Sequence, residues 1–364
     1  MSNVVFVLGA GASHAAGAPL MANFLDIATD LLRSGRVDDK REHFERVFEA
    51  IGGLQAVHSK AQLDLNNVES IFTALELGRI IQRVPGMDST KIEATISSLK
   101  ELIVKTLEVT IPFPTRKSHI GIPSPYEAFA GLLKYLREEA FPAQTVSVIS
   151  FNYDIAVDIA IFRARLGPNY VIEQAPGVHE QIDLMKLHGS LNWATESATG
   201  RIRPLHLSDY FQKYTYQGFE EHGTILVPIG SQLVEYFSKH VEPAIDVAAE
   251  PVIIPPSWNK ADYHQALSNV WSAAARHLSE AEYIFIAGYS LPETDSFFRH
   301  LYALGSVGKS TLRRIEIFNP DTSGETDARF RALLGPGSMA RYLYHPITFE
   351  KSIQHVRQLF PKRD

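Results

Sequence analysis

Short apolar runs recur along this chain, and most of them end in small or polar residues. Continuous rather than alternating apolarity predicts strands that are buried on both faces, as in a parallel sheet with helices on each side. The polar residues at the strand ends then form the edge of the sheet where ligands bind. The runs span residues 3–8, 145–151, 182–189, 251–255, 283–290 and 314–320.

A long segment that reads mostly as helices separates the first run from the second. In residues 67–84, for example, Val68, Ile71, Phe72 and Leu75 recur at helical spacing. We therefore predict an α/β fold: a Rossmann-like, mostly parallel sheet with helices on both faces and a large helical insertion after the first βα unit.

The predicted domain boundaries follow from this division of the chain. Residues 1–20 and 141–364 form the Rossmann-like domain, and residues 21–140 form the helical insertion. Residues 194–250 are richer in Tyr, His, Gln and Gly, and their pattern favours no particular element.

The composition excludes several classes of function. A formal net charge of -6 gives no overall attraction to nucleic acid or to an anionic membrane, so neither is an expected partner. The absence of cysteine removes disulfides, thiolate chemistry and cysteine zinc sites. The N-terminus has neither a basic n-region nor a long apolar segment, and we expect a cytoplasmic protein.

The first apolar run leads into Gly9-Ala10-Gly11 and then into residues that favour a helix. A strand, a glycine turn and a helix N-terminus make an anion site, because backbone N–H groups and the positive end of the helix dipole point at one spot. The third glycine of the dinucleotide fingerprint is replaced by His14, and the Lys-Ser or Lys-Thr of a P-loop is missing. The turn is therefore either a phosphate site or a plain tight turn.

Later strand ends carry polar clusters: SFNYD at 150–154, LHGS at 187–190, GYSL at 288–291 and FNPD at 318–321. Together with GAGAS at 9–13, this ordered set resembles the sirtuin superfamily, and specifically its prokaryotic sirtuin-like branch. The resemblance spans most of the chain by the order of its motifs, and it implies NAD as the substrate.

The resemblance also implies a role for each motif. One His acts as the base, an Asn and an Asp face the nicotinamide end of NAD, a glycine turn holds the pyrophosphate, and the last two motifs face the adenosine end. Carried over by position, the catalytic residues are Asn152 and His188, and the NAD-binding residues are Gly9, Ala10, Gly11, Ser13, Asp154, Gly288, Ser290 and Asn319.

The departures from the family pattern are equally informative. Sirtuin deacylases carry a zinc module with four cysteines, which cannot exist in this chain. Their Thr-Gln-Asn-Ile-Asp motif is Ser-Phe-Asn-Tyr-Asp here, and residues 18–21 read Ala-Pro-Leu-Met in place of Pro-Asp-Phe-Arg. The branch that the chain resembles includes bacterial NAD-consuming effectors, among them antiphage systems. The first hypothesis is therefore hydrolysis of NAD to nicotinamide and ADP-ribose, or a cyclic form, rather than protein deacylation.

The chemistry fits the residue types. Cleavage of the nicotinamide glycosidic bond develops positive charge on the ribose, as in glycoside hydrolysis. His188 can accept a proton near neutral pH, Asn152 offers both a donor and an acceptor, and Asp154 can accept the N–H of the carboxamide. No metal is needed for this reaction, and no His-Glu-x-x-His spacing predicts a metal ligand.

Several of these residues also have a structural interpretation. Asn152 could cap the following helix, and Ser290 and Asn319 could be turn residues. Asp158 fits an ordinary helix face, and Glu69 fits a solvated helix face better than a cleft.

Two other functions fit parts of the sequence. An α/β-hydrolase would use Ser290, Asp321 and His345 in that order, yet Pro292 stands where the nucleophile elbow needs its second glycine. A non-catalytic NAD or ADP-ribose sensor would use the same sheet edge, and the presence of both Asn152 and His188 favours catalysis over it.

Regulation is expected to come from outside the catalytic site. An unregulated NAD-consuming enzyme would deplete its own cell, and the chain has no spare sensor domain. We therefore expect a homo-oligomer or a separately encoded partner, and the family resemblance suggests a HerA-type ATPase as one candidate.

Overall fold

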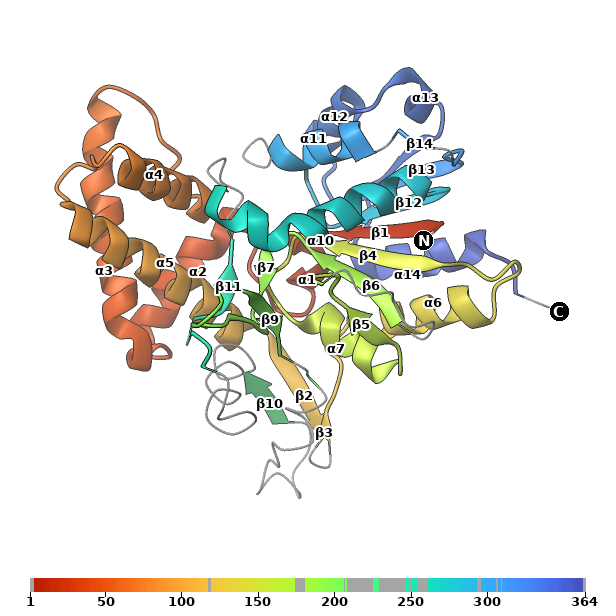
Figure 1. Cartoon of the computed structure of the whole chain (residues 1–364), viewed down its shortest axis with the longest axis horizontal. Helices are drawn as coiled ribbons and strands as arrows, with labels where there is room; N and C mark the ends of the chain where they lie inside the picture. Colours follow the sequence, from red (N-terminus) through yellow and green to blue (C-terminus); the bar gives the residue numbers. More distant parts are fainter. Residues whose placement is uncertain are drawn as a thin grey trace.

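The protein is described from a computed structural model of the whole chain (Figure 1). The structure describes residues 3–116, 119–173, 181–205, 207, 225–228, 246–248, 250–254, 261–292, 296–305, 307–308 and 310–362. Most of the unassigned segment 194–250 lies outside these residues. Within them, no helix is long and apolar enough to cross a membrane.

The fold is built on a seven-stranded, wholly parallel sheet with the order β14-β13-β12-β1-β4-β6-β5. This confirms the predicted α/β class with a parallel sheet. The strands of this sheet are β1 (Val4–Leu8), β4 (Val146–Ser150), β5 (Gly167–Asn169), β6 (Gln181–Lys186), β12 (Tyr283–Ala287), β13 (Arg314–Phe318) and β14 (Tyr342–His345).

Shorter strands lie outside this sheet. They form a group in which β2 pairs with both β10 and β3, and two separate antiparallel pairs, β7 with β11 and β8 with β9. Their bounds are β2 (Pro112–Arg116), β3 (His119–Ile120), β7 (Gly189–Ser190), β8 (Trp193–Thr195), β9 (Ile202–Pro204), β10 (Ile225–Pro228) and β11 (Val252–Ile253).

Helices account for most of the remaining described chain. The helices are α1 (Ala10–His14), α2 (Phe24–Arg33), α3 (Arg41–Leu54), α4 (Val68–Ile80), α5 (Ser89–Thr110), α6 (Tyr126–Glu138), α7 (Ala156–Arg163), α10 (Ala261–Glu280), α11 (Ser296–Gly305), α12 (Glu325–Leu333), α13 (Pro336–Met339) and α14 (Phe349–Leu359), with short 3-10 turns at Met21–Asn23, Asp38–Lys40 and Gln55–Ser59.

The order of the strands places a switch point beside β1. The chain builds outward from β1 through β4 to β6, and then returns to the other side of β1 to form β12, β13 and β14. In open parallel sheets, ligands bind outside the carboxyl ends of the strands at such a point. The carboxyl ends of β1 and β12 are Leu8 and Ala287, which are register partners.

Aromatic side chains join the sheet to the helices on one of its faces. The ring of Phe6 on β1 meets that of Phe129 on α6 edge-on at 5.1 Å, and Phe129 meets Phe349 on α14 at 5.2 Å.

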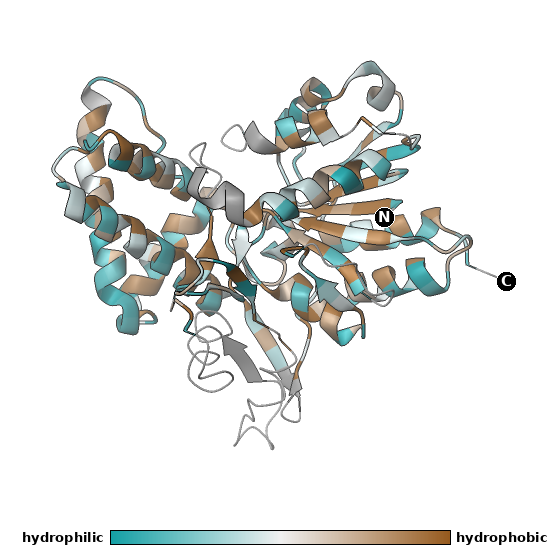
Figure 2. Ribbon diagram, in the orientation of Figure 1, coloured by the Kyte–Doolittle hydropathy of each residue, from teal (hydrophilic) through white to brown (hydrophobic). Residues whose placement is uncertain are grey.

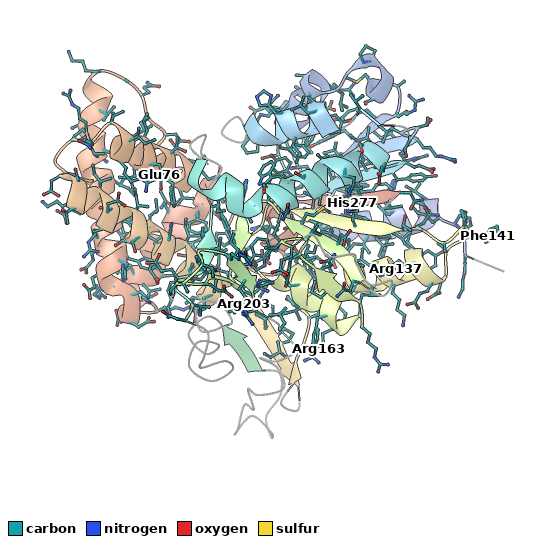
Figure 3. The ribbon with its side chains drawn as sticks, viewed as in Figure 1. Glu76, Arg137, Phe141, Arg163, Arg203 and His277 are labelled. Atoms are coloured by element: carbon teal, nitrogen blue, oxygen red, sulfur yellow. The ribbon has the colours of Figure 1, made fainter. Side chains whose placement is uncertain are left out.

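A polar contact joins α10 to the sheet: His277 Nε2 lies 2.9 Å from Asp183 Oδ2 of β6 (Figure 3). The strands of the sheet are mostly hydrophobic, and the outer helices carry hydrophilic residues (Figure 2). Burial of apolar surface therefore drives the packing of the helices on the sheet.

The helices α2 to α5 form a lobe that stands apart from the sheet (Figure 1). The predicted insertion, residues 21–140, includes this lobe but also includes α6. That helix packs against α7 and α14 beside the sheet, and Tyr135 donates a hydrogen bond from its hydroxyl to Phe360 O at 2.8 Å. The structural lobe is therefore shorter at its C-terminal end than the predicted insertion.

One apolar run does not join the parallel sheet. Residues 251–255 were expected to form one of its strands, but β11 within this run pairs antiparallel with β7. Its apolar residues are buried all the same, because the strand packs across the chain that follows β6. Continuous apolarity reports burial on both faces and does not by itself select a sheet.

A buried ion pair holds β6 against α7. Lys186 Nζ lies 2.9 Å from Asp158 Oδ2 and 2.5 Å from Asp154 O, and the side chains of Lys186 and Asp158 have no exposed surface. The other carboxylate oxygen of Asp158 accepts the hydroxyl of Tyr170 at 2.8 Å. Both carboxylate oxygens of Asp158 are thus bonded within the protein.

Removal of the cation from this pair should destabilise the fold. We expect Lys186→Met to lower the free energy of unfolding by about 3 to 5 kcal/mol, because Asp158 is left buried without its cation. Urea unfolding followed by circular dichroism measures the change. Lys134→Met is the control, since the pair of Lys134 with Glu138 is exposed and contributes little. A Lys186→Met protein as stable as the wild type would contradict this account.

Candidate functional site

A cavity lies at the carboxyl ends of β1, β4, β6 and β12. It encloses about 700 Å³ of space free of protein atoms, including its opening to solvent. The sheet contributes residues that follow each of these strands, and the helical lobe contributes the opposite wall. The lining residues are Ala10, Ser13, Ala18, Pro19, Met21, Phe24, Glu69, Leu107, Phe151, Asn152, Tyr153, Asp154, His188, Gly288, Tyr289, Ser290 and Pro292.

Two glycine turns pack against each other at the base of the cavity. A Cβ on Gly11 would lie 2.8 Å from Gly288 Cα, and a Cβ on Gly9 would lie 2.7 Å from Gly288 O. Gly288 itself has φ +64, and its Cβ would lie 2.1 Å from Ala12 N. These glycines are therefore required for the close approach of the two backbones.

The same packing uses several of the N–H groups in the first turn. Gly9 N donates to Ala287 O at 3.0 Å, Gly11 N to Gly288 O at 2.8 Å, and Ala12 N to Gly9 O at 2.9 Å. These N–H groups are bonded within the protein, so they are not open to an anion. Of the predicted turn residues, Ala10 and Ser13 line the cavity, whereas Gly9 and Gly11 support it from behind.

The hydroxyl of Ser13 is the centre of the polar network in the cavity wall. Ser13 Oγ donates to Asp154 Oδ2 at 2.7 Å and accepts from Asn152 Nδ2 at 3.0 Å. It also lies 2.7 Å from Tyr126 Oη. Because the single hydroxyl proton of Ser13 goes to Asp154, the Tyr126 hydroxyl is the donor in that contact. Ser13 thus uses its one donor and both acceptor sites.

Asn152 is held in one orientation by this network. Its Nδ2 donates to Gly9 O at 2.9 Å as well as to Ser13 Oγ, so both amide hydrogens have partners in the protein. The carbonyl oxygen Oδ1 remains as the atom of this side chain that can receive a hydrogen bond from a ligand. Asn152 does not cap α7, whose N-cap residue is Ile155.

Asp154 lies in the cavity wall and has little exposed surface. Its Oδ2 accepts from Ser13, and its Oδ1 accepts from Ala156 N at 2.9 Å. Burial raises the pKa of Asp154, while the charge of Lys186 and the hydroxyl of Ser13 act in the opposite direction. Both carboxylate oxygens are engaged with the protein, so Asp154 is placed to position Ser13.

Tyr126 completes the network from α6 and was not predicted as a site residue. Burial, together with the negative charge of Asp154, raises the pKa of its phenol well above the ordinary value, so the hydroxyl stays protonated. Tyr126 and Ser13 are 113 positions apart in the sequence. No motif in the sequence surrounds Tyr126, so only the packing of α6 reveals this contact.

His188 is brought to the cavity by β6 and fixed by β11. Its backbone carbonyl accepts Ile254 N at 2.9 Å, and Tyr153 donates from its hydroxyl to Ile254 O at 3.3 Å. Gly189 has φ +84, and a Cβ there would lie 2.1 Å from Val252 O. Strand β11 and the residue after it therefore hold the backbone at His188 and Gly189 in place.

Aromatic rings surround the imidazole of His188. Phe151 meets it edge-on at 5.2 Å, and Tyr153 lies 6.2 Å away with tilted planes. Phe151 in turn stacks on Tyr289, with ring centroids 4.3 Å apart and an angle of 6° between the planes. These rings belong to the SFNYD and GYSL motifs, in which neighbouring residues, but not the aromatic ones, were predicted as site residues.

Glu69 lines the cavity from the helical lobe. It lies in the first turn of α4, where Asn67 caps the helix by accepting Glu69 N at 2.9 Å and Ser70 N at 3.4 Å. The solvated helix face expected for Glu69 is thus incorrect, since the side chain belongs to the cavity wall. The error arose because helical periodicity identifies the buried face of α4 but not what that face encloses.

The residues predicted from the GYSL and FNPD motifs differ in whether they line the cavity. Gly288 and Ser290 line the cavity. Asn319 lies outside the lining residues, and its Oδ1 accepts Asp321 N at 3.0 Å in a local turn. Its role at the adenosine end of a ligand is untested, whereas the turn role is visible.

The arrangement does not support a hydrolase triad. Asp321 is bonded to Ser323 and to Thr326 N, and these bonds hold its pKa well below the ordinary range. His345 Nε2 lies 2.8 Å from Glu316 Oε2. Among the described residues, no hydrogen bond joins Ser290 to Asp321 or Asp321 to His345.

Solved structures with a similar fold include Sir2 proteins. Sir2Tm bound to a propionylated peptide is 12% identical, with a TM-score of 0.37 over 98% of this chain and 92% of that chain. A Sir2 homolog–NAD complex is 14% identical, with a TM-score of 0.39 over 98% and 88%. A Sir2–p53 peptide–NAD+ complex is 12% identical, with a TM-score of 0.39 over 98% and 92%. No family model and no curated protein matches the chain.

These likenesses extend over nearly the full length of each chain at low identity. Identities and scores this low do not transfer a residue role from those proteins to this one. The roles of the residues around the cavity therefore have to come from their own geometry.

The saturated hydroxyl of Ser13 gives a direct test of the network. We expect Ser13→Ala to lower the free energy of unfolding by about 1 to 3 kcal/mol, because it leaves buried groups of Asn152, Tyr126 and Asp154 without a partner. Tyr126→Phe removes one bond only, and we expect a loss of about 1 kcal/mol. Urea unfolding of both variants provides the comparison. A larger loss for Tyr126→Phe than for Ser13→Ala would contradict the central position of Ser13.

Proposed function

We propose that the chain is an NAD glycohydrolase, which cleaves the bond between nicotinamide and ribose and releases nicotinamide with ADP-ribose or a cyclic form. The observation that carries this proposal is the meeting of His188 and Asn152, from different strands, at one cavity beside the switch point. The family resemblance carried by the five sequence motifs implies NAD as the ligand.

The proposed reaction uses these two residues in different ways. As the bond from ribose C1′ to nicotinamide breaks, its electron pair moves to the ring nitrogen and positive charge develops on the ribose. A water oxygen, or a ribose hydroxyl for a cyclic product, forms the new bond to C1′. The imidazole of His188 accepts the proton of that nucleophile. Asn152 Oδ1 accepts a hydrogen bond from a ribose hydroxyl or from the water and so fixes its position.

The surroundings of the cavity support this chemistry. Phe151 and Tyr153 shield the imidazole from bulk solvent, and electrostatic interactions are stronger in a site of low dielectric constant. Glu69 brings a carboxylate from the lobe to the same cavity, where its charge can stabilise positive charge on the ribose. Asp154 and Tyr126 act through Ser13 and are proposed as positioning residues.

The alternative function is a sensor, which would bind the same ligand without cleaving it. In that case the cavity binds NAD and releases no nicotinamide. Control by a second copy or by a separate partner is proposed because an unregulated NAD-consuming enzyme would deplete its own cell. A HerA-type ATPase as that partner, and a role in antiphage defence, rest on the family resemblance alone.

Substitution of the two proposed catalytic residues tests the mechanism. We expect His188→Ala to reduce nicotinamide release by about 10² to 10⁴-fold, the range of general acid–base contributions. Asn152→Ala should reduce it by a similar factor, because the nucleophile is then no longer held beside the imidazole. The double variant should be scarcely slower than either single one, because groups that act as a unit are strongly non-additive. Nicotinamide release is measured by chromatography, with thermal unfolding recorded for every variant.

The control for this experiment is His300→Ala, because His300 is exposed on α11 and does not line the cavity. Near-wild-type release by a folded His188→Ala protein would contradict the proposed base. Wild-type protein that binds NAD in calorimetry but releases no nicotinamide would establish the sensor instead.

The charge of Glu69 has its own expected effect. We expect Glu69→Gln to lower kcat for nicotinamide release about tenfold, the factor that 1.4 kcal/mol gives, and to change KM less. The amide keeps the shape of the side chain and removes the charge that meets the transition state. Equal rates for Glu69→Gln and the wild type would show that Glu69 only fills the wall.

A further inference from the structure

A cluster of two histidines and one glutamate lies outside the cavity. Glu316 is in the middle of β13, His345 ends β14, and His355 is on α14. None of the three lines the cavity described above. The cluster was not predicted from the sequence, because its members come from three separate elements and share no short spacing.

The three side chains converge on one carboxylate oxygen. His345 Nε2 lies 2.8 Å from Glu316 Oε2, and His355 Nε2 lies 2.7 Å from the same atom. The two imidazole rings are 4.5 Å apart between centroids. Glu316 is fully buried. Each of the three residues offers one possible ligand atom, and these atoms all lie within 4.8 Å of one another.

One atom of this cluster is poorly satisfied by the protein. His345 Nε2 is buried, and among the described residues it makes no hydrogen bond of acceptable geometry, despite its short distance to Glu316. A buried polar atom without a hydrogen bond costs about 1 to 3 kcal/mol. Such an atom in a native structure calls for an explanation, and an ion bound beside it is one.

We propose that Glu316, His345 and His355 form a binding site for zinc. Two imidazole nitrogens and one carboxylate oxygen are a known donor set for Zn²⁺, with water in the remaining position. Mg²⁺ and Ca²⁺ prefer sites made of oxygen ligands, so the two imidazoles select against them. The site is independent of the NAD-cleaving function proposed for the cavity.

The distances fit this site after a small adjustment. Bonds of about 2.0 to 2.2 Å in tetrahedral geometry place neighbouring ligand atoms about 3.3 Å apart. The separations of 2.7 and 2.8 Å must therefore each open by about half an ångström. The rings of His345 and His355 are partly exposed, so an ion can reach the cluster from solvent.

Arg314 fixes the carboxylate from its other side. Its guanidinium donates from Nη1 to Glu316 Oε1 at 2.6 Å, which leaves Oε2 directed at the histidines. Carboxylates that bind metals are commonly held by such a second hydrogen bond. The positive charge of Arg314 opposes a cation, so the affinity must come mainly from the two imidazoles.

Zinc bound here would fasten α14 to the edge of the sheet. Phe349 on the same helix packs against Tyr126, with ring centroids 5.5 Å apart, and Tyr126 contacts Ser13. The ion would thus stabilise α14, which packs against Tyr126 of the Ser13 network. Binding to the native state raises stability by mass action.

Zinc uptake by the full-length chain tests the proposal directly. Chelator-treated protein is dialysed against zinc chloride, and bound zinc is measured by elemental analysis beside the thermal midpoint. We expect the wild type to retain one zinc per chain and to show a higher midpoint with zinc. His345→Ala, His355→Ala and Glu316→Gln should lose this zinc and the rise in midpoint, while the exposed His300→Ala should behave as the wild type.

Measuring both bound zinc and the thermal midpoint separates the loss of zinc binding from a loss of stability. Circular dichroism identifies variants that fold, and the comparison uses those. No retained zinc in the wild type would overturn the proposal. Undiminished zinc in folded His345→Ala and His355→Ala proteins would overturn it as well, because the ion would then be bound elsewhere. Uptake of magnesium in preference to zinc would also contradict the assigned donor chemistry.

Discussion

The structure of the cavity depends on the close approach of two backbone turns at the centre of the sheet. The turn after β1 and the turn after β12 meet through Gly11 N and Gly288 O at 2.8 Å. Side chains at these positions would collide with the opposite backbone. Ser13, in α1 directly after the first of these turns, reaches Asn152 and Asp154, which follow β4.

From Ser13 the polar network extends along the cavity wall. Its hydroxyl joins Asn152, Asp154 and Tyr126. The backbone carbonyl of Asp154 then accepts Lys186 Nζ, which pairs with Asp158. A contiguous set of buried bonds therefore links the cavity wall to β6 and α7. Such networks stabilise one arrangement of the core when every member is satisfied.

The sequence allowed the sheet and much of the cavity to be predicted. Continuous apolar runs identified β1, β4, β6, β12 and β13, and the polar residues after four of these strands do line one cavity. The short edge strands β5 and β14 carry weak signals, and β11 has the apolarity of a sheet strand but pairs elsewhere. Periodicity measures burial, and the choice of neighbour depends on tertiary packing.

The residues that the sequence did not reveal share a physical cause. Tyr126 reaches Ser13 from α6, and Glu69 reaches the cavity from α4, so both depend on how a helix packs rather than on a local motif. The Glu316 cluster likewise joins two strands and a helix. Motifs identify residues at strand ends because the parallel sheet brings those ends together. No comparable rule brings helix residues to the same place.

The orientation of Asn152 limits what its side chain can do in any reaction at this cavity. Both hydrogens of Nδ2 are committed to Gly9 O and Ser13 Oγ. The amide therefore acts toward a ligand as an acceptor through Oδ1, and its partner must be a donor such as a hydroxyl or water. The imidazole of His188 lines the same cavity and can take up the proton from such a donor. The positioning role proposed for Asn152 thus rests on hydrogen bonds made inside the protein. The proton transfer proposed for His188 rests on the chemistry of its imidazole at the same cavity.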